Sequence, residues 1–167
     1  MKKVKSLLAI ASLAFGMFLM NACDDPCKDV VCQNGGVCDE GDCICATGYE
    51  GTDCATEMRT KFLGTYSFID GCYPGTPNSS TFSTSADGIT KITITNILGN
   101  TLGGTAKAEI DGVKITIPSQ QILDNDSDPW TIAGASTGTL ANNTFTISVT
   151  YTFGTNTETC LLTFTKQ

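Results

Sequence analysis

The sequence predicts an all-β protein that joins a small disulfide-rich module to a larger antiparallel β domain. Six cysteines are crowded into residues 27–54. From residue 61 onward, apolar and polar residues alternate over short segments, which is typical of strands with one buried face. The chain after residue 22 shows no apolar pattern of helical period. We therefore expect residues 61–167 to form an up-and-down β-barrel, with a β-sandwich as the alternative.

The N-terminal residues have the pattern of an export signal. Three lysines within the first five residues precede an apolar run from Leu7 to Met20, which is short for a membrane span and typical of a signal sequence. Residues 19–23, LMNAC, resemble a lipobox, although Asn21 stands where a small residue is expected. The resemblance implies that residues 1–22 are removed as a lipoprotein signal peptide and that Cys23 receives fatty acyl chains such as palmitate. An uncleaved anchor and a plain secreted protein remain alternatives.

The number of cysteines also favours lipidation. The chain has nine cysteines, and an odd number in an exported protein leaves one thiol without a partner. If Cys23 carries lipid, the remaining eight can all pair. Asp24 and Asp25 follow in the anchored N-terminus, residues 23–26, and resemble the surface-export signal of Bacteroidota lipoproteins; a solvated acidic linker is the alternative. We expect attachment to the outer membrane, with exposure at the cell surface.

The cysteine-rich stretch contains two recognisable patterns. Residues 32–38 read C-x-N-G-G-x-C, and residues 43–54 read C-x-C-x-x-G-Y-x-G-x-x-C. Residues 27–54 thereby resemble a module of the epidermal-growth-factor-like (EGF-like) family. A metal-thiolate cluster is the alternative, but the stretch has no CxxC pair and the chain has no histidine. The resemblance implies the disulfides Cys27–Cys38, Cys32–Cys43 and Cys45–Cys54.

The second domain follows a short linker at residues 55–60. Seven segments alternate as strands do: 64–69, 89–95, 105–110, 113–117, 130–139, 145–153 and 160–164; residues 119–123 are the candidate for an eighth. Asp111-Gly112 and Asn142-Asn143 are turn signals between them. A disulfide between Cys72 and Cys160 would hold the first and last strands side by side, as a closed barrel requires. Gly64-Thr65-Tyr66 resembles the Gly-x-Trp start of lipocalin-like barrels, with tyrosine in place of tryptophan.

Composition narrows the possible functions. The chain has no histidine, which removes the commonest general base, and the expected pairing leaves no cysteine as a nucleophile. We therefore expect no catalytic residues and no cofactor. Three of the ten basic residues lie in the signal, so seven oppose 17 acidic residues in the mature chain, a net charge of −10. Without a basic patch, a nucleic-acid partner is not expected.

Two features are candidates for a binding site. Asp124, Asp126 and Asp128 alternate as in the opening of a calcium loop, but Pro129 stands where glycine is expected. A solvated acidic loop is the alternative, and we expect no metal. Trp130 is the only tryptophan; it is either a core residue or a ligand-facing one.

These features favour a non-catalytic cell-surface lipoprotein. We expect the EGF-like module to act as a spacer for a β domain that contacts a protein or a glycan, with the lipid anchor holding the chain to the membrane. The alternative is a lipocalin-like barrel that binds a small apolar ligand inside, which would require a cavity among its inward-facing residues. A hydrolase would require two carboxylates that converge in a cleft.

Overall fold

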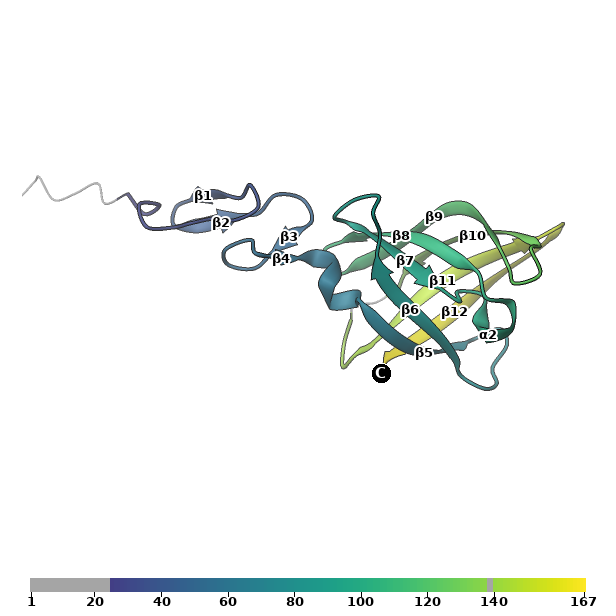
Figure 1. Ribbon diagram of the computed structural model, residues 1–167. Coiled ribbons are helices and arrows are strands. Elements are labelled where there is room, and N and C mark those ends of the chain that lie inside the picture. Colours follow the sequence, from purple (N-terminus) through teal and green to yellow (C-terminus); the bar gives the residue numbers. More distant parts are fainter. Residues whose placement is uncertain (1–24, 138–139) are drawn as a thin grey trace, which may run out of the picture.

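The computed structural model describes residues 25–137 and 140–167. The proposed signal peptide, Cys23 and Asp24 lie outside the described residues. The described chain is all-β, with a disulfide-rich module at one end of a closed eight-stranded barrel (Figure 1). None of its helices has the length and apolar character needed to cross a membrane.

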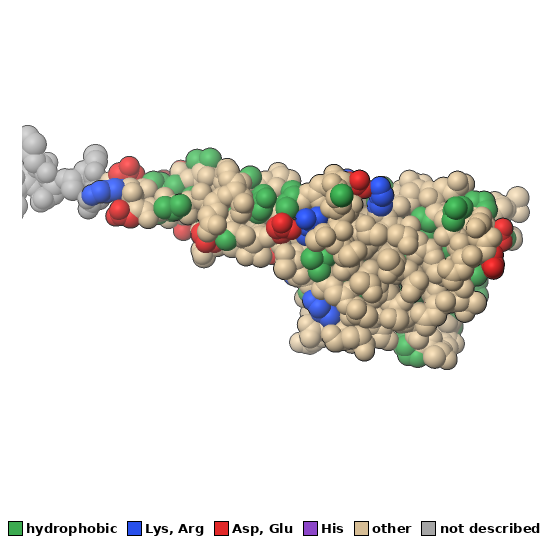
Figure 2. All heavy atoms as spheres, viewed as in Figure 1, with side chains coloured by type: hydrophobic (Ala, Val, Ile, Leu, Met, Phe, Trp, Pro, Cys, Tyr) green, Lys and Arg blue, Asp and Glu red, His purple; other side chains and the backbone are tan. Residues whose placement is uncertain are grey.

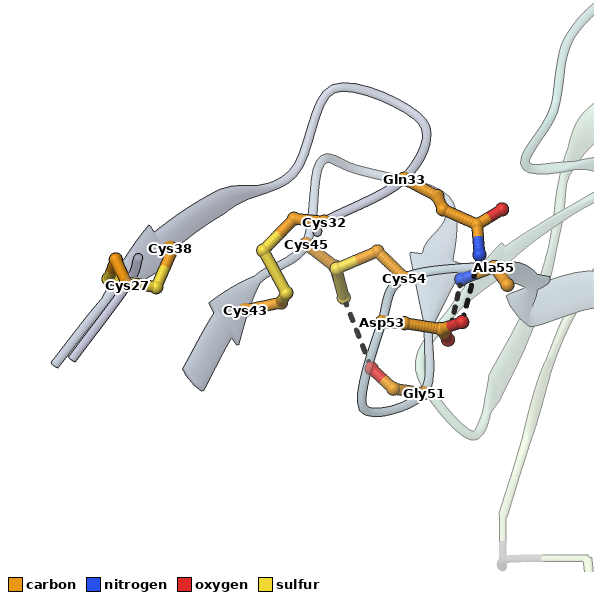
Figure 3. Close-up of a disulfide and its surroundings, with 10 residues drawn as sticks. All are labelled: Cys27, Cys32, Gln33, Cys38, Cys43, Cys45, Gly51, Asp53, Cys54 and Ala55. Atoms are coloured by element: carbon orange, nitrogen blue, oxygen red, sulfur yellow. Dashed lines mark hydrogen bonds between the residues drawn. A yellow bond between two sulfur atoms is a disulfide. The ribbon is translucent and has the colours of Figure 1, made fainter. Parts of the chain in front are cut away.

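The module consists of two small antiparallel sheets held by disulfides. β1 (Val37–Asp39) pairs with β2 (Asp42–Ile44), and β3 (Tyr49–Glu50) pairs with β4 (Thr56–Glu57). Its described part buries one apolar side chain completely, Cys54, so it has almost no hydrophobic core. Each disulfide contributes about 2–4 kcal/mol to such a fold. The three bonds are those that the EGF-like resemblance implied: Cys27–Cys38, Cys32–Cys43 and Cys45–Cys54 (Figure 3).

The barrel is an up-and-down meander in which consecutive strands pair and the last strand pairs with the first. β12 runs antiparallel to β5, from Leu162 opposite Asp70 to Lys166 opposite Tyr66. This ladder closes the sheet, which confirms the expected barrel and excludes the sandwich. The strands are β5 (Gly64–Asp70), β6 (Asn78–Thr84), β7 (Lys91–Thr95), β8 (Thr105–Asp111), β9 (Lys114–Leu123), β10 (Pro129–Ser136), β11 (Thr144–Phe153) and β12 (Asn156–Lys166).

The eighth strand is not the one suggested by the sequence. Residues 119–123 are the second half of β9, and the additional strand is β6, whose sequence NSSTFST is mostly polar. β6 buries only Ser80 and Phe82, so it lacks an apolar repeat. Val113, expected in phase with Ile115, instead lies in the turn after Asp111 and is about half exposed.

Aromatic side chains fill the barrel near the module. The 3₁₀ helix η2 (Met58–Phe62) leads into β5 and buries Phe62 against Phe145, with ring centroids 5.9 Å apart. The Tyr66 hydroxyl donates a hydrogen bond to the Phe62 carbonyl (2.9 Å), and burial raises the pKa of Tyr66 to about 12. Further rings continue this cluster along the interior: Phe68, Phe82 and Phe164. The near half of the barrel is therefore packed with side chains.

The segment expected as a linker is an ordered joint. Residues 56–57 form β4, and the next five residues form η2. Buried Arg59 donates from its Nη1 to the carbonyls of Ser85 (3.1 Å), Gly88 (2.9 Å) and Lys91 (2.9 Å), all at the β6–β7 connection. Its Nε contacts Glu57 at 2.8 Å. One side chain thus ties the end of the module to the barrel wall.

Three further contacts fix the joint. Gly48 of the module packs so closely on the barrel that a Cβ there would lie 2.6 Å from Cγ2 of Ile89. Its carbonyl accepts the Met58 amide at 2.9 Å, and Lys61 pairs with Glu50 at 2.6 Å. Backbone packing, hydrogen bonds and ion pairs therefore join the two parts.

Candidate binding cleft at the free end of the barrel

The lining of the barrel changes from apolar to polar and aromatic at the end remote from the module. Side chains two positions apart share a face of a strand. Beyond buried Phe68, Ser80 and Ile132, the next positions on the same face of β5, β6 and β10 are Asp70, Asn78 and Trp130, and the corresponding ends of β11 and β12 carry Tyr151, Phe153 and Glu158.

These side chains line an open cavity of about 660 Å³, a volume within the usual range for small-ligand sites. The cavity lies opposite the module, because η2 enters the barrel at the start of β5 whereas Asp70 ends that strand. The short helix α2 (Gly99–Leu102) forms one wall, with Leu98 and Leu102 in the lining. Figure 1 shows α2 on the side of the barrel away from the module. We call this cavity the distal cleft.

Hydrogen bonds hold the α2 wall in place from two sides. The Asn78 side chain accepts the Asn100 amide at 2.9 Å, and the Asn100 side chain accepts the Ser79 amide at 2.8 Å. On the other side, the Asn125 amide donates to the Leu102 carbonyl at 2.8 Å. The wall is thereby fixed to β6 and to the β9–β10 loop, so this side of the cleft is preformed.

Trp130 is held in the cleft by the acidic β9–β10 loop. Its Nε1 donates to Oδ2 of Asp124 at 3.0 Å, and its ring stacks on Phe153 with centroids 4.7 Å apart. Oδ1 of Asp124 accepts the backbone amides of Asp126 (3.0 Å) and Asp128 (2.9 Å). The Trp130 hydrogen bond, helped by these amides, lowers the pKa of the Asp124 carboxyl. Asp124 therefore shapes the loop and orients the indole.

The three aspartates considered as calcium ligands, Asp124, Asp126 and Asp128, take different roles in this loop. Both carboxylate oxygens of Asp124 already accept hydrogen bonds from the protein, whereas Asp126 and Asp128 supply backbone amides to it. Among the described residues, one group of potential metal ligands lies together: Asp70, Cys72 and Cys160. Its two sulfurs are joined in a disulfide, which removes the thiolates that a metal would need.

Two carboxylates, Asp70 and Glu158, lie in the cleft. Glu158 accepts a hydrogen bond from the Tyr73 hydroxyl at 2.7 Å, and Asp70 accepts the Cys72 amide at 2.8 Å. The bond to Glu158 and the nearby negative charges raise the pKa of Tyr73. Burial raises the pKa of Tyr151, and the Asp70 charge raises it further. Neither carboxylate takes part in an ion pair among the described residues.

The Cys72–Cys160 disulfide lies beside these groups. It joins the segment after β5 to β12, and the Gly71 amide donates to the Leu161 carbonyl at 2.9 Å. These two links anchor the beginning of the β5–β6 loop, which carries Tyr73, and place it next to Glu158. The disulfide thus contributes to the cleft as well as to closure of the barrel.

Sequence reasoning identified Trp130 as a ligand-facing candidate but missed the other residues that surround it. Asp70 and Glu158 carried a usable signal, because each places a charge where the alternation of its strand expects an apolar residue. Phe153 looked like the last core position of its strand, yet it is 40 % exposed. Tyr73 lies in a loop and carried no signal.

No family model, curated protein or solved structure matches this chain. A proposal for the function therefore rests on two features of the structure, the distal cleft and the ordered joint.

Proposed function

We propose that this protein is a non-catalytic, lipid-anchored cell-surface protein that contacts a protein or glycan partner through the distal cleft. The EGF-like module is the spacer between the anchor and the barrel. The observation that carries the proposal is the position of the cleft, at the end of the barrel opposite the module. A chain anchored at its N-terminus would present this end outward.

The cysteine pairing supports an anchor at Cys23. All eight cysteines from Cys27 onward are in disulfides, which leaves Cys23 as the one cysteine outside these pairs. It is also the cysteine that ends the lipobox-like segment. Lipid chains contribute about 0.8 kcal/mol per buried methylene, so several chains on one residue would hold the protein durably in a membrane.

The ordered joint supports a spacer role for the module. Arg59, Gly48 and Lys61 connect the module to the barrel through hydrogen bonds, backbone packing and an ion pair. A spacer of this kind keeps the cleft away from the membrane, whereas a flexible tether would let the barrel fold back onto it.

The alternative of an apolar ligand inside the barrel has less support. The interior near the module is filled by packed aromatic rings such as Tyr66, Phe82 and Phe164, and buried Ile132 and Val149 fill the level between these rings and the cleft. An apolar ligand would have to bind in the open distal cleft, beside two carboxylates.

The cleft does bring together two carboxylates, as a two-carboxylate hydrolase would require. Each of them already accepts a hydrogen bond, from the Cys72 amide or from the Tyr73 hydroxyl, and the described lining has no basic group to stabilise a developing negative charge. We therefore expect the purified mature chain to release no nitrophenol from aryl glycosides, and sustained turnover abolished by Glu158→Gln would contradict a non-catalytic role.

Surface display is tested by protease treatment of intact cells that make the full chain. We expect a chain with an accessible protease site to be cleaved on intact cells, while a periplasmic marker survives, and Cys23→Ala to shift the protein from the membrane to the soluble fraction. Because a compact barrel resists proteolysis, a protease site inserted after Thr155, in the β11–β12 turn, provides a cleavable version. Cleavage of that version only after lysis would contradict surface display.

A further inference from the structure

The distal cleft combines aromatic surface with negative charge, and the two features define its ligand. Phe153 is 40 % exposed and Tyr73 is 70 % exposed, so ring surface is available at the opening. Trp130 stacks on Phe153 and is held by a hydrogen bond to Asp124. Aromatic faces attract cations within about 6 Å, by roughly 0.5–2 kcal/mol depending on exposure.

Carboxylates add a second attraction for a cation. Asp70 and Glu158 are in the lining, and no lysine or arginine is among the described residues that line the cleft. Their hydrogen-bond partners, an amide and a tyrosine hydroxyl, carry no positive charge. The negative charge of this cavity is therefore not neutralised from within the described chain.

The charged residues of the whole barrel are also distributed unevenly, with an excess of acidic residues at the cleft end. The segments at the cleft end, residues 70–78, 96–104, 123–130 and 153–158, contain five acidic and no basic residues. The rest of residues 58–167 contains six basic and three acidic residues. Figure 2 shows acidic and hydrophobic side chains together at the free end, whereas the basic side chains of the barrel lie nearer the module, beside further acidic ones. This asymmetry would attract a cationic partner to the cleft end.

We propose that the distal cleft binds a long cationic side chain, lysine or arginine, from a partner protein. The apolar stem of such a side chain would lie along Leu98, Leu102 and Phe153, and its charged end would meet Asp70 and Glu158. One ring face of Trp130 is already stacked on Phe153, so that face is not available for stacking against a sugar ring. The proposal rests on the proposed function, because it names the chemistry of the contact made by this cleft.

The test uses the complete mature chain with Cys23→Ser, which removes the lipid site. Trp130 is the only tryptophan and lies in the cleft, so its fluorescence reports binding directly. The probes are acetyl-Gly-Lys-Gly-amide and its arginine counterpart. The matched neutral probe contains Nε-acetyl-lysine, which retains the stem and loses the charge. We expect saturable binding of at least one cationic peptide, weakened by added salt, and binding of the neutral peptide that is at least fivefold weaker.

Variants locate the bound charge. Glu158→Gln keeps an acceptor for the Tyr73 hydroxyl and should weaken binding about fivefold, as expected for loss of one close charge at an exposed site. Phe153→Leu keeps the apolar stem contact and should weaken binding about two- to fivefold. Asp87→Asn, at the module end, should leave the affinity unchanged. Amide NMR spectra of each variant verify the fold.

The proposal would be overturned by equal binding of charged and neutral peptides, by an unchanged affinity in Glu158→Gln, or by no saturable response to either cationic peptide. Tighter binding of a glucosamine oligomer than of the cationic peptides would assign the cleft to a glycan and also overturn it. These measurements use purified protein, so their failure would be distinguishable from a failure of surface display on cells.

Discussion

At the scale of single residues, the acidic β9–β10 loop shows how one carboxylate can build a site without being its ligand. Asp124 accepts two backbone amides with one oxygen and the Trp130 indole with the other. The loop is thereby closed and the indole is oriented against Phe153. An acidic pattern that resembles a metal loop is used here to position an aromatic ring.

The lowered pKa of Asp124 makes this loop sensitive to acid. Because the folded-state pKa lies below the ordinary 3.8, the ionised carboxylate stabilises the fold above that value, and the contribution is lost as pH falls through the folded pKa. We expect Asp124→Asn to lower the unfolding temperature near neutral pH and to reduce the fall of that temperature between pH 5 and 2. Trp130 fluorescence during thermal unfolding measures both effects.

Asp126→Asn is the matched control for this prediction. Its backbone amide, and not its side chain, bonds to Asp124, so the substitution changes the loop charge by the same amount and leaves the bonds of Asp124 in place. An equal effect of the two substitutions on the pH dependence would show that loop charge, and not the Asp124 contacts, is responsible.

The residues of the cleft also show what can be read from sequence at this scale. Trp130 stood out because it is the only tryptophan. Asp70 and Glu158 could have been found because each is a charged residue at a position where the strand alternation expects an apolar one. That these residues meet in one cleft could not be predicted from the sequence, because it depends on the register in which β12 pairs with β5, and long-range pairing fixes that register. Tyr73 reaches Glu158 across 85 residues of sequence.

At the scale of elements, the segment between module and barrel is the main departure from expectation. Residues 55–60 are short and polar, which suggested a linker. In the structure, they complete the β3–β4 sheet and begin η2, and Arg59 finds its three acceptors at a connection about 30 residues later. Polar composition did not indicate this role, because the acceptors are backbone carbonyls that any sequence provides.

The close packing of Gly48 on Ile89 provides a direct test of this joint. We expect Gly48→Ala to open it, because a Cβ would lie 2.6 Å from Ile89 Cγ2 and the residue has a φ of +92°. Hydrogen exchange of the Met58 amide, which bonds to the Gly48 carbonyl, should become about tenfold faster or more, the ratio that corresponds to 1.4 kcal/mol.

Gly35→Ala is the matched control, since Gly35 has a φ of +78° but open space around it. It should leave exchange at Met58 unchanged. Adding Ile89→Ala to Gly48→Ala removes the clash and should restore part of the protection. No recovery in that double variant would show that backbone strain, and not packing on the barrel, governs the joint.

The Cys72–Cys160 disulfide and the β5–β12 ladder both join the ends of the barrel. The disulfide spans a sequence separation of 88 residues, for which the chain-entropy estimate is about 4–5 kcal/mol. We expect the double variant Cys72→Ala/Cys160→Ala to lose about this much free energy of unfolding in urea and still to fold, because the ladder remains. A variant that no longer folds would show that the ladder alone cannot close the barrel.

Strand prediction succeeded where alternation is strong and failed where it is weak. β11 has the longest alternating run, and its observed bounds lie within one residue of those expected. β6 was missed because its inward positions include Ser80, whose hydroxyl is satisfied by the Thr95 carbonyl at 2.6 Å. Burying one satisfied polar group allows a strand that has almost no apolar pattern.

At the scale of the whole molecule, the chain forms an arm with three regions that follow one another along its length. Its module has a larger net negative charge than the barrel and is held by disulfides, the near half of the barrel is packed with aromatic rings, and the far end opens into an acidic, aromatic cleft. Figure 1 shows the module and the barrel following one another along this arm. This order along the axis could not be predicted from sequence, because residues of the cleft come from five strands and two loops that are separated along the chain.

The central claim is that module and barrel form one rigid arm with the cleft at its free end. Residual dipolar couplings of the mature chain carrying Cys23→Ser test it most directly. We predict that the amides of residues 27–57 and of the barrel fit a single alignment tensor, and that Arg59→Met separates them into two tensors of different magnitude. Two tensors in the chain with Arg59 intact would contradict the claim.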